Sequence, residues 1–288
     1  MNRRAILKWL GLLGLGPLIG RAGVSWGNAC SVGPSTAVFY ERPIPDELVD
    51  RYERLIVEAD AISSDQVLLA GRAEPFLYIS IGEAEPWRAG YETLDPTWFL
   101  GRNEGWGGNI VDLTQPGWLQ YILEVRIWPL WARGYRGFFL DTLDSFRALP
   151  LTSEQLAEQE VALNAILRGI YERYPTIRLI LNRGFDLWPS FGRQAVGVVA
   201  ESLLHGWDAV GKSYFRVQPA DHAWLLAKLE TARDTYGLPV TVIDYLPLTD
   251  RAAARHAARR IRDLGFTPWV TAPQLNAVGI GLPDLKCS

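Results

Sequence analysis

The sequence has few of the residues that most often bind metals or form cross-links. Its 288 residues include three histidines and two cysteines, Cys30 and Cys287, with no Cys-x-x-Cys pair. A structural zinc site needs several such ligands at close spacing, so we expect none. The two cysteines lie near opposite ends of the chain, and in an exported protein they could form one disulfide; the alternative is two free thiols.

Motifs of several large enzyme classes are also missing. No G-x-S-x-G sequence, which positions a serine nucleophile, follows a predicted strand. No glycine-rich phosphate loop joins a predicted strand to a helix, since Gly105-Trp106-Gly107-Gly108 lies inside a long loop. The net charge is −3, whereas a nucleic-acid-binding protein usually carries a basic surface. We expect no cofactor and no nucleic-acid partner.

The N-terminus has the pattern of an export signal. Met1-Asn2-Arg3-Arg4 is basic, and residues 10–19 form an apolar segment too short to cross a bilayer as a helix. The arginine pair resembles the twin-arginine signal of bacterial export. We therefore expect a signal over 1–29 and a periplasmic or extracellular mature protein over 30–288. The alternatives are an ordinary secretory signal and an uncleaved signal that attaches the protein to the membrane.

Eight short apolar segments are typical of strands buried on both faces. They cover residues 37–40, 55–58, 76–82, 137–141, 177–182, 196–201, 240–245 and 267–271. Helical patterns cover 116–133, 153–174, 219–236 and 249–264, the second beginning with the capping sequence Thr152-Ser153-x-Gln155. This alternation predicts an α/β protein with a single (β/α)₈ TIM-like barrel and one domain over 30–288.

One long segment, 85–112, has neither pattern. It follows the third predicted strand and contains Trp87, Trp98 and Trp106. We expect an irregular loop over the face of the barrel that carries active sites, because long loops of this kind are often functional.

Acidic residues recur at the ends of the predicted strands. Glu83, Asp141, Glu201 and Asp244 each follow an apolar run. The strand ends of a barrel converge on one mouth, which here would collect these acids together with Tyr40, Glu58, Asn182, Arg183 and Tyr245. For any one acid, capping of the next helix or turn is the alternative to catalysis.

Clustered carboxylates suit glycoside hydrolysis. Repulsion and burial raise the pKa of some acids, so that one stays protonated while its neighbour stays ionised. Two such carboxyl groups flanking a glycosidic bond are what its hydrolysis requires. The other use of clustered carboxylates is a hard metal ion. We rank it lower because no D-x-D-x-D-G loop is present and histidines are scarce.

Four segments at strand ends carry a family resemblance. They are residues 78–85 (YISIGEAE), 134–145 (GYRGFFLDTLDS), 181–185 (LNRGF) and 200–203 (AESL). In this order they resemble the endo-α-1,4-polygalactosaminidase glycosidases of glycoside hydrolase families 114 and 166. The likeness runs from the first strand to about Gly281. It implies a TIM-like barrel and endo-hydrolysis, with retention of configuration, of an exopolysaccharide of α-1,4-linked galactosamine or N-acetylgalactosamine.

The resemblance also implies roles for individual residues. The catalytic pair falls on Asp141 and Glu201, with the aspartate as nucleophile and the glutamate as acid/base, although the pair is better supported than the division of roles. Substrate binding is expected from Tyr40, Glu83, Trp106, Asp144, Asn182, Arg183, Trp207, Asp244 and Tyr245. Asp144 is the main rival of Asp141. Trp106, Trp188 and Trp207 are candidates for sugar stacking, with core packing as the alternative.

The expected partner is a polysaccharide substrate, with exopolysaccharide biosynthesis or export proteins as further partners. We expect a monomer that needs no metal. A function from another class stays open, namely a non-catalytic protein that binds the exopolysaccharide and aids its export or retention. The presence of both acids favours the enzyme, because a protein that only binds needs no acid/base pair.

Overall fold

The computed structural model describes residues 33–62 and 68–281. The predicted signal, Cys30 and Cys287 lie outside the described residues. Eight parallel strands form one sheet in the order β1-β2-β3-β7-β8-β9-β12-β13. Their bounds are β1 Thr36–Phe39, β2 Arg54–Val57, β3 Glu74–Ser80, β7 Gly137–Asp141, β8 Arg178–Asn182, β9 Gly197–Glu201, β12 Val240–Tyr245 and β13 Thr267–Thr271. All eight predicted strands are confirmed, three with the predicted bounds and five with ends that differ by one or two residues.

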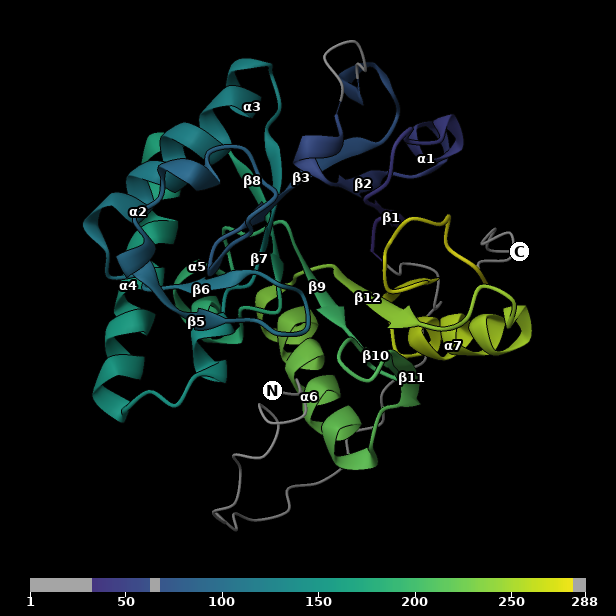
Figure 1. Cartoon of the computed structure of the whole chain (residues 1–288). Coiled ribbons are helices and arrows are strands. Elements are labelled where there is room, and N and C mark those ends of the chain that lie inside the picture. Colours follow the sequence, from purple (N-terminus) through teal and green to yellow (C-terminus); the bar gives the residue numbers. More distant parts are fainter. Residues whose placement is uncertain (1–32, 63–67, 282–288) are drawn as a thin grey trace.

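The sheet curls into a nearly closed barrel, so the predicted TIM-like fold is confirmed (Figure 1). The side chain of Thr267, at the start of β13, donates to the carbonyl oxygens of Gly33 and Pro34 at 3.4 Å, just before β1. Past the other end of β1, the backbone N–H of Tyr40 donates to the carbonyl of Leu275 at 2.7 Å. The first and last strands are thus held side by side. Strand residues are buried on both faces, as in β7, where Gly137 to Leu140 are all buried.

Helices surround the strands (Figure 1). The long ones are α4 Ser153–Arg173, α6 Pro219–Tyr236 and α7 Arg251–Asp263, all at predicted positions. The expected capping box at Thr152 and Gln155 begins α4. Shorter helices are α1 Asp46–Arg51 and α5 Trp188–Phe191, with 3₁₀ turns η2 Ala59–Ala61, η3 Leu68–Ala70, η4 Tyr91–Thr93, η5 Pro96–Trp98, η7 Ser145–Ala148 and η8 Phe185–Leu187.

The helix predicted over 116–133 is present but is not uniformly α-helical. It consists of α2 Pro116–Tyr121, the π-helical segment η6 Ile122–Ile127 and α3 Trp128–Ala132. Pro129 follows the π segment and has no N–H to donate to the preceding turn, which explains why the regular hydrogen-bond pattern is interrupted there.

The prediction that residues 85–112 are irregular is wrong. They contribute β5 Phe99–Arg102 and β6 Asn109–Val111, which with β4 Glu83–Ala84 form an antiparallel sheet in the order β4-β6-β5. A second unpredicted pair, β10 His205–Asp208 and β11 Ser213–Arg216, forms a hairpin after β9. These strands are two to four residues long, and glycines and polar residues interrupt their apolar pattern.

No helix within the described ranges is both long enough and apolar enough to cross a membrane.

A test of the barrel packing uses Gly137 at the start of β7. A Cβ there would lie 2.3 Å from the carbonyl oxygen of Pro75 on β3, a backbone atom that cannot move aside alone. We expect Gly137→Ala to lower the free energy of unfolding by about 2 kcal/mol or more, measured by urea denaturation. Gly237→Ala is the matched control, because Gly237 has φ +67° but no atom within 4 Å of the added Cβ. It should lose only about 1 kcal/mol. Equal losses would contradict the packing argument.

Candidate active site

The ends of three neighbouring strands bring two carboxylates together. Asp141, Asn182 and Glu201 are the last residues of β7, β8 and β9, and β8 lies between the other two strands. The side-chain amide of Asn182 donates to Oδ1 of Asp141 at 2.6 Å and to Oε1 of Glu201 at 3.1 Å. The two acids predicted as a pair therefore share one amide nitrogen.

This shared nitrogen limits the distance between the carboxylates. Distances of 2.6 and 3.1 Å meet at one atom, so Oδ1 of Asp141 and Oε1 of Glu201 lie within about 5.7 Å of each other. Retaining glycosidases have carboxyl groups roughly 5–5.5 Å apart, and inverting enzymes place them about 6.5–9.5 Å apart to admit a water molecule. The geometry favours the shorter class.

Glu201 is held by groups from two further positions. The hydroxyl of Tyr245, at the end of β12, donates to Oε2 of Glu201 at 2.5 Å. The guanidinium of Arg183 donates to the backbone carbonyl of Glu201. The structure thus places Tyr245, Asn182 and Arg183, all predicted site residues, around one catalytic candidate.

Thr142 fixes the position of Asp141. It has φ 61°, which is strained for a β-branched residue, at a cost of about 1–3 kcal/mol. Its hydroxyl accepts from the backbone N–H groups of Ile81 and Gly82, at 3.1 and 2.8 Å, and donates to the carbonyl of Asp141 at 2.6 Å. These bonds join the end of β7 to the end of β3, so the strained turn is held in place. Thr142 follows directly after an acid at a strand end, but nothing in its sequence context predicts the positive φ.

Two buried tyrosine hydroxyl groups lie near Asp141. Burial raises the pKa of Tyr40, and the charges of Asp141 and Glu58 raise it further. Burial likewise raises the pKa of Tyr78, and Asp141 adds to the effect. The two rings meet edge to face, with centroids 5.5 Å apart. Both phenols therefore stay protonated and can donate hydrogen bonds. Tyr78 was not predicted as a site residue, although its side chain shares one face of β3 with those of Phe76 and Ser80.

A buried arginine neutralises other acids near this end of the barrel. Arg88 donates to Glu58 at 2.5 and 2.9 Å, to Asp60 at 2.9 Å, and to Glu85. Burial alone would lower the pKa of Arg88, but the bonds to Glu58 and Glu85 raise it above its ordinary value. Its guanidinium lies 4.8 Å from the ring centroid of Tyr78. Arg88 thus pairs with three acids and connects them to the ring of Tyr78.

Asp244 does not have the predicted role. Its side chain is 0% exposed, so it cannot contact a substrate. It accepts hydrogen bonds from the backbone N–H groups of Leu203, Leu204 and His205, at 2.7–3.1 Å. Asp244 therefore holds the chain that follows Glu201, and its effect on the site is indirect.

Glu83 is also occupied by the protein itself. It is 5% exposed and accepts from the amide of Asn103 at 2.9 Å and the hydroxyl of Ser145 at 2.6 Å. These bonds tie the turn after β5 and the start of η7 to β4. The structure thus gives Glu83 a structural position in place of the expected contact with sugar.

The tryptophans divide into buried and accessible ones. Trp188 is 3% exposed and donates to the carbonyl of Arg183, which excludes it as a stacking surface. Trp106 is 38% exposed in the turn between β5 and β6. Trp207, on β10, packs edge to face on Tyr214, with centroids 4.8 Å apart. Trp106 and Trp207 remain candidates for sugar contact.

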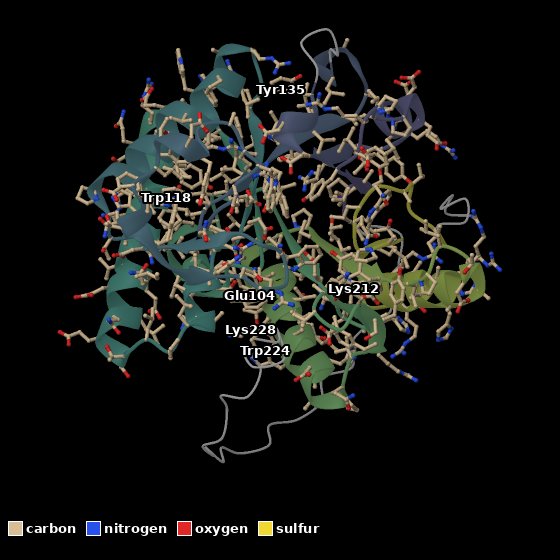
Figure 2. The ribbon with its side chains drawn as sticks, in the orientation of Figure 1. Glu104, Trp118, Tyr135, Lys212, Trp224 and Lys228 are labelled. Carbon is tan, nitrogen blue, oxygen red and sulfur yellow. The ribbon has the colours of Figure 1, made fainter. Side chains whose placement is uncertain are left out.

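The two inserted structures that carry these tryptophans lie close to each other. A Cβ on Gly105 would lie 3.4 Å from Cβ of Ala209, in the turn of the β10–β11 hairpin. Figure 2 shows Glu104 and Lys212, which belong to these same two turns, on one side of the barrel. The contact joins the segments inserted after β3 and after β9.

Asp144 lies just past the catalytic strand. It is half-buried at the N-terminal end of η7, where its backbone carbonyl accepts from Arg147 at 2.9 Å. Its side chain does not cap that turn, so the capping alternative does not apply to it.

Within the described ranges, no group of three or more His, Cys, Asp or Glu side chains is arranged to hold a metal ion.

The chain is similar to a known protein family and to proteins of known structure. Residues 49–283 match the model of glycoside-hydrolase family GH114. The glycoside hydrolase domain of PelA from Pseudomonas aeruginosa is 34% identical, with a TM-score of 0.78 over 86% of this chain and 99% of that domain. Ega3 from Aspergillus fumigatus, solved with galactosamine, is 15% identical and shares the fold, with a TM-score of 0.61 over 91% of this chain and all of that one.

A curated relative is an uncharacterised protein of Deinococcus radiodurans. It is 24% identical over 217 residues, which are 72% of this chain. The match spans 66% of that protein, slightly less than two thirds of its length.

The anchoring role of Asp244 can be tested by Asp244→Asn. In the variant, an NH₂ group replaces one carboxylate oxygen and faces backbone N–H donors. The buried side chain then loses the hydrogen bonds that this oxygen accepted. We expect the free energy of unfolding to fall by about 3 kcal/mol. Asp208→Asn is the control, since Asp208 also accepts backbone N–H groups, from Val210 and Gly211, but in a solvent-exposed turn. It should lose less than about 1 kcal/mol. A stable Asp244→Asn protein would contradict the role.

Proposed function

This chain belongs to glycoside-hydrolase family GH114, and is therefore a glycoside hydrolase; from that we propose that it is an exported endo-glycosidase that cleaves an exopolysaccharide of α-1,4-linked galactosamine or N-acetylgalactosamine. The observation that carries the proposal is the pairing of Asp141 and Glu201 through Asn182. The four strand-end segments that resemble polygalactosaminidases all lie around this pair.

The short distance between the carboxylates supports a retaining mechanism. In the first step an oxygen of Asp141 attacks the anomeric carbon, and the bond from that carbon to the glycosidic oxygen breaks. Glu201 gives its proton to the leaving oxygen. In the second step Glu201 takes a proton from water, whose oxygen attacks the anomeric carbon and releases Asp141. Each carboxyl returns to its starting state, so no cofactor is consumed.

The charge of the site supports an amino sugar as substrate. Free galactosamine units are cationic near neutral pH, and the carboxylates of Asp141, Glu201 and Asp144 lie at or next to strand ends on the mouth side. Cationic units would therefore be attracted to the site. Galactosamine is a suitable first ligand to test, because it occupies Ega3, a protein of the same fold.

Residues 1–29 would direct the protein out of the cytoplasm, and an exopolysaccharide substrate would lie outside the cytoplasm as well.

Trp106 and Trp207 are proposed to contact sugar units on either side of the cleaved bond, since both are accessible and lie on the segments inserted after β3 and β9.

The proposal is tested with partially deacetylated α-1,4-polygalactosamine and the purified mature protein. We expect the wild type to release oligomers, detected by mass spectrometry, with retained anomeric configuration by proton NMR. Asp141→Asn and Glu201→Gln should each fold normally and lose at least about 10³-fold in hydrolysis, because one removes the nucleophile and the other the proton donor.

The matched controls are Asp234→Asn and Glu230→Gln, which make the same chemical changes on the exposed face of α6 and should keep full activity. Full hydrolysis by either site variant would remove that residue from the mechanism. Binding of the polymer by the wild type without cleavage would favour the non-catalytic alternative.

A further inference from the structure

Asn182 has an unusual set of hydrogen bonds for a sugar-binding residue. Both of its N–H groups point at carboxylates of the protein, Asp141 at 2.6 Å and Glu201 at 3.1 Å. Its own carbonyl oxygen, Oδ1, is buried and has no hydrogen-bond partner within residues 33–62 and 68–281. The hydrogen bonds that orient the amide are therefore those to the two carboxylates. A buried acceptor left without a partner costs free energy, about 1–3 kcal/mol.

The choice of residue type matters here because both acids are hydrogen-bonded to one atom. A cation between two carboxylates would keep both of them ionised, and neither could then deliver a proton. An apolar side chain would leave the two charges facing each other without a donor. A neutral amide offers one N–H to each carboxylate and leaves one of them able to hold a proton.

We propose that Asn182 is a positioning residue that sets both the spacing and the joint protonation of Asp141 and Glu201. This inference rests on the proposed function and deepens it, since it replaces the expected contact of Asn182 with sugar. The backbone supports the assignment, because Asn182 ends β8, the strand that pairs with β7 on one side and β9 on the other. The amide is thus fixed by the same ladder that fixes the two acids.

Other groups face the pair and stay constant when Asn182 is changed. Tyr245 donates to Glu201 from β12, and Arg183 donates to the backbone carbonyl of the same residue. Further titratable or charged groups near the pair, among the described residues, include Tyr40 after β1, Glu58 after β2, and Tyr78 on β3 with Arg88 beside its ring. Asn182 donates to both carboxylates, and its replacement by alanine removes both of these bonds at once.

The expected effect has a definite sign. The N–H groups of Asn182 stabilise the ionised form of each carboxylate, so their removal favours protonation of the pair. Both titration steps of the pair should move to higher pH in Asn182→Ala, by about one pH unit. Asn182→Asp has nearly the same shape but adds a third carboxylate, and it should move them further.

The first experiment needs no substrate. The protein is labelled with ¹³C at Asp and Glu carboxyl carbons, resonances are assigned with the Asp141→Asn and Glu201→Gln variants, and pH titrations are compared. Upward shifts of about one unit in Asn182→Ala or Asn182→Asp are expected. Midpoints within about 0.3 unit of wild type in both variants would overturn the proposal. Asn109→Ala is the matched control, because Asn109, on β6, donates its amide to the hydroxyl of Tyr91 in η4 and its removal should leave the titration unchanged.

The second experiment separates positioning from sugar binding. With the polymer as substrate, Asn182→Ala should lower kcat by about 10²-fold, change KM less than about three-fold, and move the pH optimum of kcat/KM upward. A KM increase of about ten-fold or more at unchanged kcat would show that Asn182 binds sugar, and would overturn the proposal. If the wild type does not cleave the polymer, the proposed function fails, and the titration still decides whether Asn182 couples the two acids.

Discussion

The parallel pairing of β7, β8 and β9 is the constraint on which the site depends. Because these strands run in one direction, their last residues reach the same end of the barrel, and Asp141, Asn182 and Glu201 meet there. Successive side chains of a strand point to opposite faces, so a slip of one residue in β8 would turn Asn182 away from both acids. The register of these three strands, more than the conformation of the loops, therefore sets the distance between the two carboxylates.

Buried polar groups around the pair keep its position. Asp244 holds the chain after Glu201, Thr142 holds the end of β7 to β3, and Arg88 gathers the acids behind Tyr78. Each of these groups is costly to bury unless it is hydrogen-bonded, and each is bonded to backbone or to an opposite charge. Acidic residues near the site thus serve two purposes. Asp141 and Glu201, which end β7 and β9, accept from the amide of Asn182, whereas Asp244 holds the backbone in place.

Most of the barrel could be predicted because its strands are continuous apolar runs. β7, β12 and β13 have the predicted bounds, and α6 begins and ends where its pattern does. The strands β4, β5 and β6 could not be found this way, since they are short, contain polar residues and glycines, and pair with each other outside the main barrel sheet. The π segment in the predicted 116–133 helix was also missed, because the periodicity of apolar residues does not distinguish it from an α-helix.

The sequence by itself determined that acids lie at the ends of buried strands, and that Asp141 and Glu201 are the candidates for catalysis. The strand pattern alone did not distinguish Glu201 from Asp244, since both follow an apolar run of the same kind, and the family resemblance still placed both of them in contact with the substrate. Only the tertiary structure decided this difference. The end of β9 lies beside Asn182 and Tyr245, whereas the carboxylate of Asp244 is enclosed by backbone N–H groups of the next segment. Which groups surround a carboxylate depends on contacts between distant segments, and those contacts are not encoded in the local pattern.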